Sequence, residues 1–112
     1  MFTFTILEDK EGQAVGFEAQ GHVGVFGKGE NPGCAAASFL TQMLITAIKD
    51  ELFVFVNVKQ GENGELSCHI TNMLLPPQQE KVDFLFHIAE RGLKDLPKMD
   101  PSAEIRVERR RK

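Results

Sequence analysis

The stretch that decides the fold, residues 21–38, reads Gly-His-Val-Gly-Val-Phe-Gly-Lys-Gly-Glu-Asn-Pro-Gly-Cys-Ala-Ala-Ala-Ser. His22 follows a segment of strand character, and Gly24, Gly27 and Gly29 then mark a loop. Cys34 stands at the start of a long apolar segment with helical spacing. This order predicts that an imidazole and a thiol lie at the same end of the fold.

The start of the predicted helix is typical of a reactive cysteine. Asn31 is a favoured N-cap residue, and Pro32 suits the first helical position because its missing N–H would have no partner there. Cys34 then falls at about the third helical position. Unpaired amides and the positive end of the helix dipole stabilise a thiolate in the first turn, which lowers the thiol pKa below the free value of about 8.5.

The spacing of apolar residues over 34–51 leaves Cys34 away from the middle of the apolar side of this helix. The thiol falls on the side of Ser38 and Thr41. A half-buried, inert thiol is the alternative interpretation, since structural cysteines are usually small buried hydrophobes. The predicted apolar stripe consists of Phe39, Leu40, Met43, Leu44, Ala47 and Ile48.

These residues carry a resemblance to a known family. Gly21-His22, eleven intervening residues, Cys34-Ala35 and then Ser38 resemble the signature of the ribosomal-processing cysteine protease family Prp, which includes YsxB-like proteins. The resemblance implies that Cys34 is the nucleophile, that His22 is the general base, and that Ser38 helps to orient the thiol. The supporting and substrate-loop residues that it implies are Gly21, Gly24, Gly27, Gly29, Asn31, Gly33 and Ser38.

The resemblance also implies a function. Its members are small cytoplasmic endopeptidases that remove the N-terminal extension of a large-subunit ribosomal protein during ribosome assembly, cleaving after an aromatic residue. A homodimer and the absence of a cofactor are further implications. The chain departs from the family pattern at Val23 and at Asn31-Pro32-Gly33. These departures motivate an alternative, a catalytically impaired, ribosome-associated binding protein of the same fold.

Length and composition indicate one domain, residues 1–112, with a single core. Hydrophobic residues make up 42% and charged residues 26%, which is ordinary for a globular protein. The sequence has no signal-peptide pattern and no apolar run of the roughly 20 residues that span a bilayer, so a cytoplasmic location without membrane contact is expected. Two cysteines form neither a disulfide framework nor a metal-ligand pattern.

The remaining segments predict a two-layer α+β fold in the order ββαββα(β), with both helices on one face of a mixed sheet. Residues 52–59 are apolar on both faces and are typical of a buried strand. Pro97 is expected to end the second helix. The predicted strands are 2–8, 13–20, 52–59, 65–71 and 103–109, and the second helix is 78–96.

The other candidate groups outside residues 21–38 favour structural roles. Cys68 alternates with Leu66 and Ile70 and is expected to be inert core, with His69 on the opposite face. His87 is expected on the surface of the second helix. Four phenylalanines either line a dimer interface or fill the core beneath the helices: Phe2, Phe4, Phe53 and Phe55. The glycine loop lacks the spacing of a P-loop.

Charge is concentrated at the end of the chain. Residues 106–112 hold five of the 13 Lys and Arg residues and one of the 16 acids, so this tail is +4 and the rest of the chain is −7. The run of cations is compatible with a weak contact to ribosomal RNA, although a solvated tail is its commoner role. The acidic remainder favours a basic substrate segment through long-range attraction.

Overall fold

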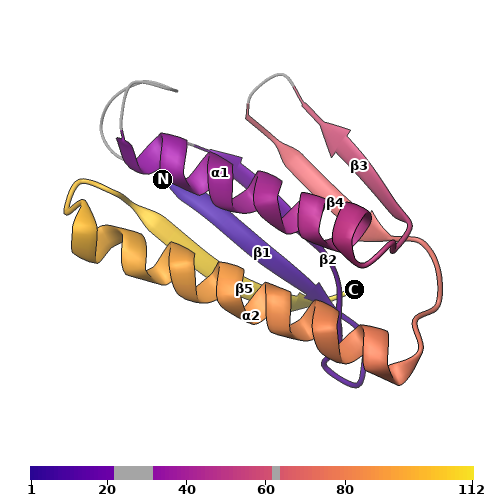
Figure 1. Cartoon of the computed structure of the whole chain (residues 1–112). Helices are drawn as coiled ribbons and strands as arrows, with labels where there is room; N and C mark the ends of the chain where they lie inside the picture. Colours follow the sequence, from indigo (N-terminus) through magenta and orange to yellow (C-terminus); the bar gives the residue numbers. More distant parts are fainter. Residues whose placement is uncertain (22–31, 62–63) are drawn as a thin grey trace.

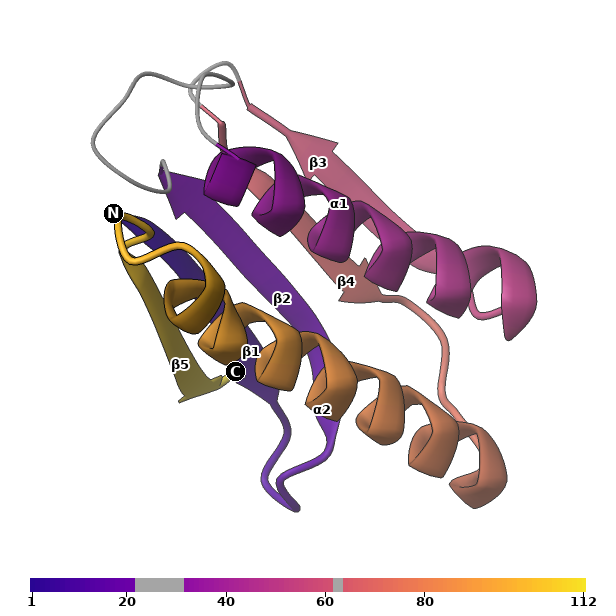
Figure 2. The ribbon, with the colours of Figure 1, turned by 60° about the vertical axis from the view of Figure 1, so that its left-hand side comes forward.

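The computed structural model describes residues 1–21, 32–61 and 64–112, with the backbone alone at Pro32 and Cys34. A layer of two helices covers one face of a five-stranded sheet (Figures 1 and 2). The α+β architecture predicted from the sequence is confirmed. The elements are β1 (Phe2–Glu8), β2 (Ala14–Gly21), α1 (Pro32–Thr46), a π-helical turn (Ala47–Glu51), β3 (Val56–Gln60), β4 (Leu66–Ile70), α2 (Pro76–Met99) and β5 (Ile105–Arg111).

The sheet is mixed, with strand order β3-β4-β2-β1-β5. β1 pairs antiparallel with β2 in a hairpin and parallel with β5, while β4 pairs antiparallel with both β2 and β3. The segments through α1 and α2 therefore connect strands that are parallel but not adjacent, and β3 and β5 form the two edges. This topology brings the end of β2 and the start of α1 to the same end of the sheet (Figure 2).

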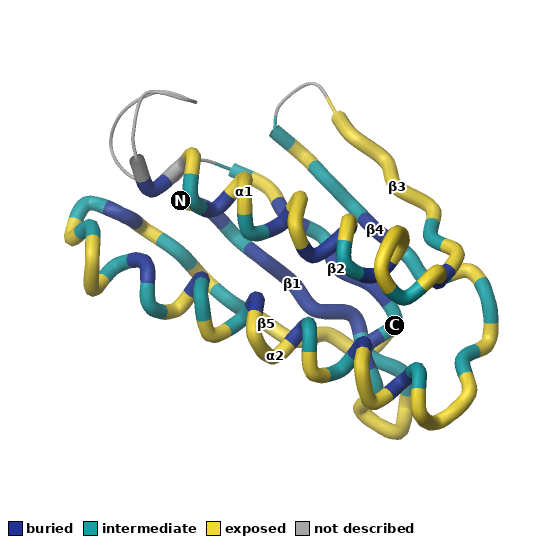
Figure 3. Tube along the Cα trace, in the orientation of Figure 1, coloured by how far each residue is buried: buried dark blue, intermediate teal, exposed yellow. Residues whose placement is uncertain are grey.

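Aromatic packing between the sheet and α2 forms the centre of the core. Phe4 and Phe17 lie on neighbouring strands with ring centroids 5.0 Å apart, and Phe86 of α2 meets Phe17 edge-on at 6.2 Å. All three side chains are fully buried, and the strands beneath the helices are the most buried part of the chain (Figure 3). Burial of each such ring stabilises the fold by about 2–3 kcal/mol.

The buried face of α1 differs from the predicted stripe. Leu44 and Ile48 are buried as expected, but Phe39 and Met43 are 65% and 45% exposed, and Thr41 is buried. The polar Thr41 is accommodated because its hydroxyl donates to the carbonyl oxygens of Ala37 and Ser38, at 3.2 and 3.0 Å. The sequence prediction was wrong here because small and hydroxyl-bearing side chains let α1 approach the sheet while larger apolar groups remain outside.

The strand predicted over 52–59 is shorter and more exposed than expected. β3 begins at Val56, and most of its residues are exposed because it is an edge strand. The turn before it contains Phe53 with φ +57°, a left-handed conformation unusual for a non-glycine residue. Of the four phenylalanines with two possible roles, Phe2 and Phe4 fill the core, whereas Phe53 and Phe55 are 79% and 71% exposed.

Two further predictions were wrong: the end of the second helix at Pro97 and the solvated state of the basic segment. α2 continues through Pro97 to Met99, since this proline lies close to the end of the helix and Leu93 and Leu96 anchor the last turns in the core. The basic segment 106–112 is not a solvated tail, because residues as far as Arg111 form β5. Arg109 bonds Glu8 of β1 and Glu90 of α2, each at 2.9 Å.

Close contact between the two helices depends on one glycine. A Cβ at Gly92 of α2 would lie 3.3 Å from the methyl groups of Leu40 of α1. The residue that interrupts the apolar pattern of α2 therefore admits the Leu40 side chain. No helix among the described residues is both long and apolar enough to cross a membrane.

Candidate active site

The candidate residues are divided between described and undescribed segments. His22, Gly24, Gly27, Gly29 and Asn31 lie outside the described residues, as does Val23. The described members of the candidate site are Gly21, Gly33 and Ser38, together with the backbone of Cys34. They lie at the end of β2 and in the first two turns of α1.

Cys34 is the third residue of α1, which begins at Pro32. The helix start agrees with the prediction from sequence, and Gly33 beside the cysteine is buried. The first amides of an α-helix have no partner within the helix, and the helix dipole places partial positive charge there. The backbone thus sets Cys34 in a position that favours an anionic form of a side chain and an oxyanion close to it.

Gly21 has a structural requirement for glycine. Its φ of +98° is rarely adopted by residues with a side chain, and a Cβ at this position would collide with the carbonyl oxygen of Met1. Gly21 lies opposite Phe2 in the β1–β2 ladder and is the last residue of β2. Glycine is therefore required at the end of β2, immediately before His22 in the sequence, which spacing alone did not reveal.

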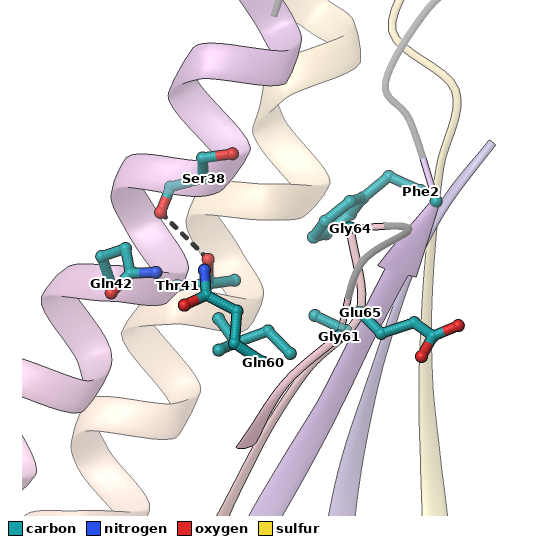
Figure 4. A pocket seen from close by; sticks show the side chains of 11 residues that line it. Phe2, Ser38, Thr41, Gln42, Gln60, Gly61, Gly64 and Glu65 are labelled. Carbon is teal, nitrogen blue, oxygen red and sulfur yellow. Dashed lines mark hydrogen bonds between the residues drawn. The ribbon is translucent and has the colours of Figure 1, made fainter. Parts of the chain in front are cut away.

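A small cavity lies beside the first turns of α1. Its volume is about 100 Å³, and Ser38, Thr41 and Gln42 of α1 form one wall (Figure 4). Ser38 is exposed and stands four residues after Cys34, which places it one helical turn further along the same side of α1. The Thr41 hydroxyl donates to the Ser38 carbonyl oxygen and so braces this wall.

The opposite wall comes from the sheet and the β3–β4 connection. Gln60 and Glu65 contribute polar groups to the lining, and Phe2 and Leu66 contribute apolar surface; the further lining residues are Ala19, Gly21, Gly61 and Gly64. Sequence reasoning identified Gly21 and Ser38 but missed Gln42, Gln60 and Glu65. For Gln42 a signal was available, because it follows Ser38 by four residues and therefore lies on the same side of the helix. Nothing in the local sequence linked the β3–β4 turn to α1.

Cys68 is confirmed as core. It lies in the middle of β4, opposite Phe17 on one side and Val58 on the other, and its side chain is fully buried. Burial raises the pKa of its thiol to about 11. A thiol in this setting is neutral at physiological pH and is inaccessible to a substrate.

The two described histidines lie away from the candidate site. His69 lies on the sheet face that the helices leave open, and its Nδ1 is 3.0 Å from Lys112 Nζ. Burial lowers the pKa of His69, the charges of Lys112 and Lys59 lower it further, and Glu18 opposes them. His87 is exposed on α2, as the sequence predicts. Within residues 1–21, 32–61 and 64–112, no group of three or more metal-ligating side chains occurs.

The family model for cysteine protease Prp matches residues 1–104, nearly the whole chain. The chain belongs to the Prp cysteine protease family. The resemblance first carried by residues 21–38 thus extends across both helices and the strands β1 to β4, and it ends just before β5. No curated protein matches the chain significantly.

Solved structures agree with this fold. The ribosomal processing protease Prp from S. aureus, bound to a covalently linked product peptide, aligns with a TM-score of 0.78 at 16% identity, covering 98% of this chain and 100% of that one. Its complex with a substrate peptide aligns with a TM-score of 0.74 at 15% identity, with the same coverage. SMU.848 from Streptococcus mutans gives 0.74 at 24% identity, covering 100% of this chain and 96% of the other.

Proposed function

We propose that this chain is an active cysteine endopeptidase that uses Cys34 as nucleophile and His22 as general base. The position of Cys34 in the first turn of α1 carries the proposal, since that turn favours a thiolate. The family match and the peptide-bound S. aureus Prp structures support the same chemistry. The substrate would be the N-terminal extension of a large-subunit ribosomal protein, which places the enzyme in the cytoplasm during ribosome assembly.

The proposed reaction has two stages. His22 accepts the proton of Cys34, and the thiolate attacks the peptide carbonyl carbon. The tetrahedral intermediate carries an oxyanion, which unpaired amides at the start of α1 would stabilise. The carbon–nitrogen bond then breaks, His22 donates its proton to the leaving amine, and a thioester remains on Cys34. Water hydrolyses the thioester, which releases the acid and restores the thiol.

The direct test is incubation of the purified protein with the large-subunit ribosomal proteins of its host, with new N-termini identified by mass spectrometry. The Cys34→Ala variant is the negative control, and Cys68→Ala is the matched cysteine control. A cut made by the unaltered chain and by Cys68→Ala, but not by Cys34→Ala, would support the proposal. Retention of the substrate by all three forms without a cut would favour the catalytically impaired binding protein.

We also propose that two copies associate through the outer surface of the helices. Phe39 and Met43 of α1, together with Phe84 and Ile88 of α2, are 45–65% exposed. Nearly apolar hollows of about 210 and 440 Å³ lie along the junction of the helices. Exposed apolar surface of this kind is typical of interfaces. Phe84→Glu should halve the mass measured by sedimentation equilibrium, and an unchanged mass would contradict the proposal.

A weak contact with ribosomal RNA remains a separate proposal for the basic segment. Arg106, Arg110 and Lys112 alternate along and beyond β5 and so share the open face of the sheet. Arg110 is paired with Glu18 at 2.6 Å, but both side chains are about half exposed, and such pairs are weak. RNA binding that weakens steeply with salt, and further in Arg110→Gln, would support this contact.

A further inference from the structure

The free edge of β3 has unused backbone hydrogen-bonding groups. Within the described chain β3 pairs only with β4. Two bonds fix the pairing pattern: Thr71 N to Phe55 O at 3.0 Å and Gly61 N to Glu65 O at 2.8 Å. In an antiparallel ladder alternate residues face the partner strand, so residues 57 and 59 also bond β4. The N–H and C=O groups of Val56, Val58 and Gln60 therefore point outward.

The side chains along this edge are suited to an apolar, extended partner. Val58 is 41% exposed and Phe55, at the approach to the strand, is 71% exposed. Natural edge strands usually carry charges, prolines or bulges, which prevent another strand from pairing with them. Between Val56 and Gln60 the sequence offers only Lys59 as such a charge. The edge is thus open to strand addition and carries apolar side chains that would contact the added segment.

One end of this edge lies beside the candidate active site. Gln60 is the last residue of β3, and it lines the small cavity together with Ser38 and Gln42 of α1 (Figure 4). The end of β3 and the start of α1 also lie toward the same end of the molecule (Figure 1). A peptide paired along β3 would therefore leave the strand beside the helix that carries Cys34.

We infer that the free edge of β3 binds the substrate as an added strand, which delivers the peptide bond to Cys34. The bonds would be made with the N–H and C=O groups of Val56, Val58 and Gln60. Backbone pairing of this kind gives affinity, and contacts with the side chains of Val58 on one face of the sheet and Phe55 on the other would favour apolar substrate residues beside each of them. This inference rests on the proposed protease function and adds to it a mode of substrate recognition.

An extended peptide fits this edge better than a second copy of the chain. Exposed apolar side chains on the helices, such as Phe39 and Phe84, offer a separate surface for self-association, whereas the β3 edge ends at the cavity beside α1. The edge strand is only five residues long, which suits a short unfolded segment. An N-terminal extension that must be cleaved is necessarily accessible as such a segment.

N-methylation of the substrate backbone tests the inference with an unaltered enzyme. A synthetic peptide spanning the cleavage site found in the host ribosomal protein would be methylated at one amide at a time. Methylation at alternate residues should raise KM by about tenfold or more, because it removes a hydrogen bond and blocks close approach. Methylation at the intervening residues should have little effect. Binding of the same peptides to Cys34→Ala gives a second readout that does not require turnover.

The matched protein variants are Val58→Pro and Val58→Thr. Proline removes the outward N–H and should raise KM with little change in kcat, whereas threonine retains the N–H and should behave like the original chain. Cleavage of the unmodified peptide without an alternating methylation pattern would overturn the inference and leave the protease assignment intact. A Val58→Pro variant that changes only the assembly mass would instead assign the edge to self-association and overturn the inference.

Discussion

The two cysteines of this chain occupy contrasting positions in one fold. Cys68 lies in the middle of β4 with its side chain fully buried in the core, and burial raises the pKa of its thiol to about 11. Cys34 is the third residue of α1, where helix amides lack partners. We therefore expect the same functional group to be inert in β4 and to be favoured as an anion at the start of α1. On this view the backbone around each thiol decides its chemistry.

The largest expected difference between the two cysteines is in catalysis. Cys34→Ala should lower kcat/KM for the ribosomal-protein peptide by at least about 10³-fold, since the covalent route is lost. Cys68→Ala should leave kcat/KM within about twofold of the original value, because the thiol is buried away from the candidate site. Steady-state kinetics on the two purified variants would measure both effects. Equal losses of kcat/KM in the two variants would contradict the assignment of Cys34 alone as the nucleophile.

Replacing the proposed base should have the next largest effect. His22→Ala is expected to lower kcat by about 10²- to 10⁴-fold, the usual contribution of general acid–base catalysis. The matched control is His87→Ala, because His87 is exposed on α2. The rate of cleavage as a function of pH should lose its lower limb in the first variant alone. An unchanged pH profile in His22→Ala would contradict its role.

Gly21 tests whether the end of β2 requires a glycine. Gly21→Ala should lower the free energy of unfolding by about 1–3 kcal/mol, because alanine is strained at a positive φ and would collide with the Met1 carbonyl. Chemical denaturation would measure the loss. Gly12→Ala is a suitable control: this residue also has positive φ, at +81°, but has open space around it. A Gly21→Ala variant no less stable than Gly12→Ala would show that the collision is relieved.

Cys68 should make stability depend on alkaline pH. The folded thiol keeps its proton to about pH 11, whereas the unfolded thiol releases it near 8.5, so the unfolded chain binds fewer protons between these values. The free energy of unfolding should therefore fall as pH rises from about 8.5 to 11. Cys68→Ala should cost about 1–2 kcal/mol at neutral pH and show a shallower decline. Parallel slopes for the two proteins would exclude this contribution.

The smallest expected effect concerns the basic segment. Arg109 bridges Glu8 and Glu90 at 2.9 Å each and is 41% exposed, so Arg109→Gln should cost about 1 kcal/mol. Desolvation acts to raise the pKa of Glu90, but the bond to Arg109 and its charge outweigh it and hold that pKa low. The stabilisation should therefore be present at neutral pH and be lost as pH falls through the lowered pKa of Glu90. Thermal melts at pH 7 and pH 3 would measure the difference.

The sequence predicted the element order and the start of α1 because alternation, prolines and glycines are local signals. It predicted Cys68 as core for the same reason. It did not predict that Phe39 and Met43 would remain outside while Thr41 is buried, because this depends on how closely α1 approaches the sheet. The exposure of β3 depends on its place at the edge of the sheet, which the local sequence does not indicate. The place of Gln60 and Glu65 beside the cavity depends on pairing between segments that are distant in the sequence. The proposed partnership of Cys34 with His22 stays a prediction.

The pH dependence of alkylation at each cysteine tests the central claim most directly. Iodoacetamide would be added to the folded protein across a range of pH, and modification at Cys34 and Cys68 would be quantified separately by peptide mass spectrometry. We predict that Cys34 reacts with an apparent pKa below about 8.5 and that Cys68 reacts only after denaturation. A Cys34 thiol that titrates at or above 8.5, or resists modification as Cys68 does, would contradict the claim that the start of α1 activates it.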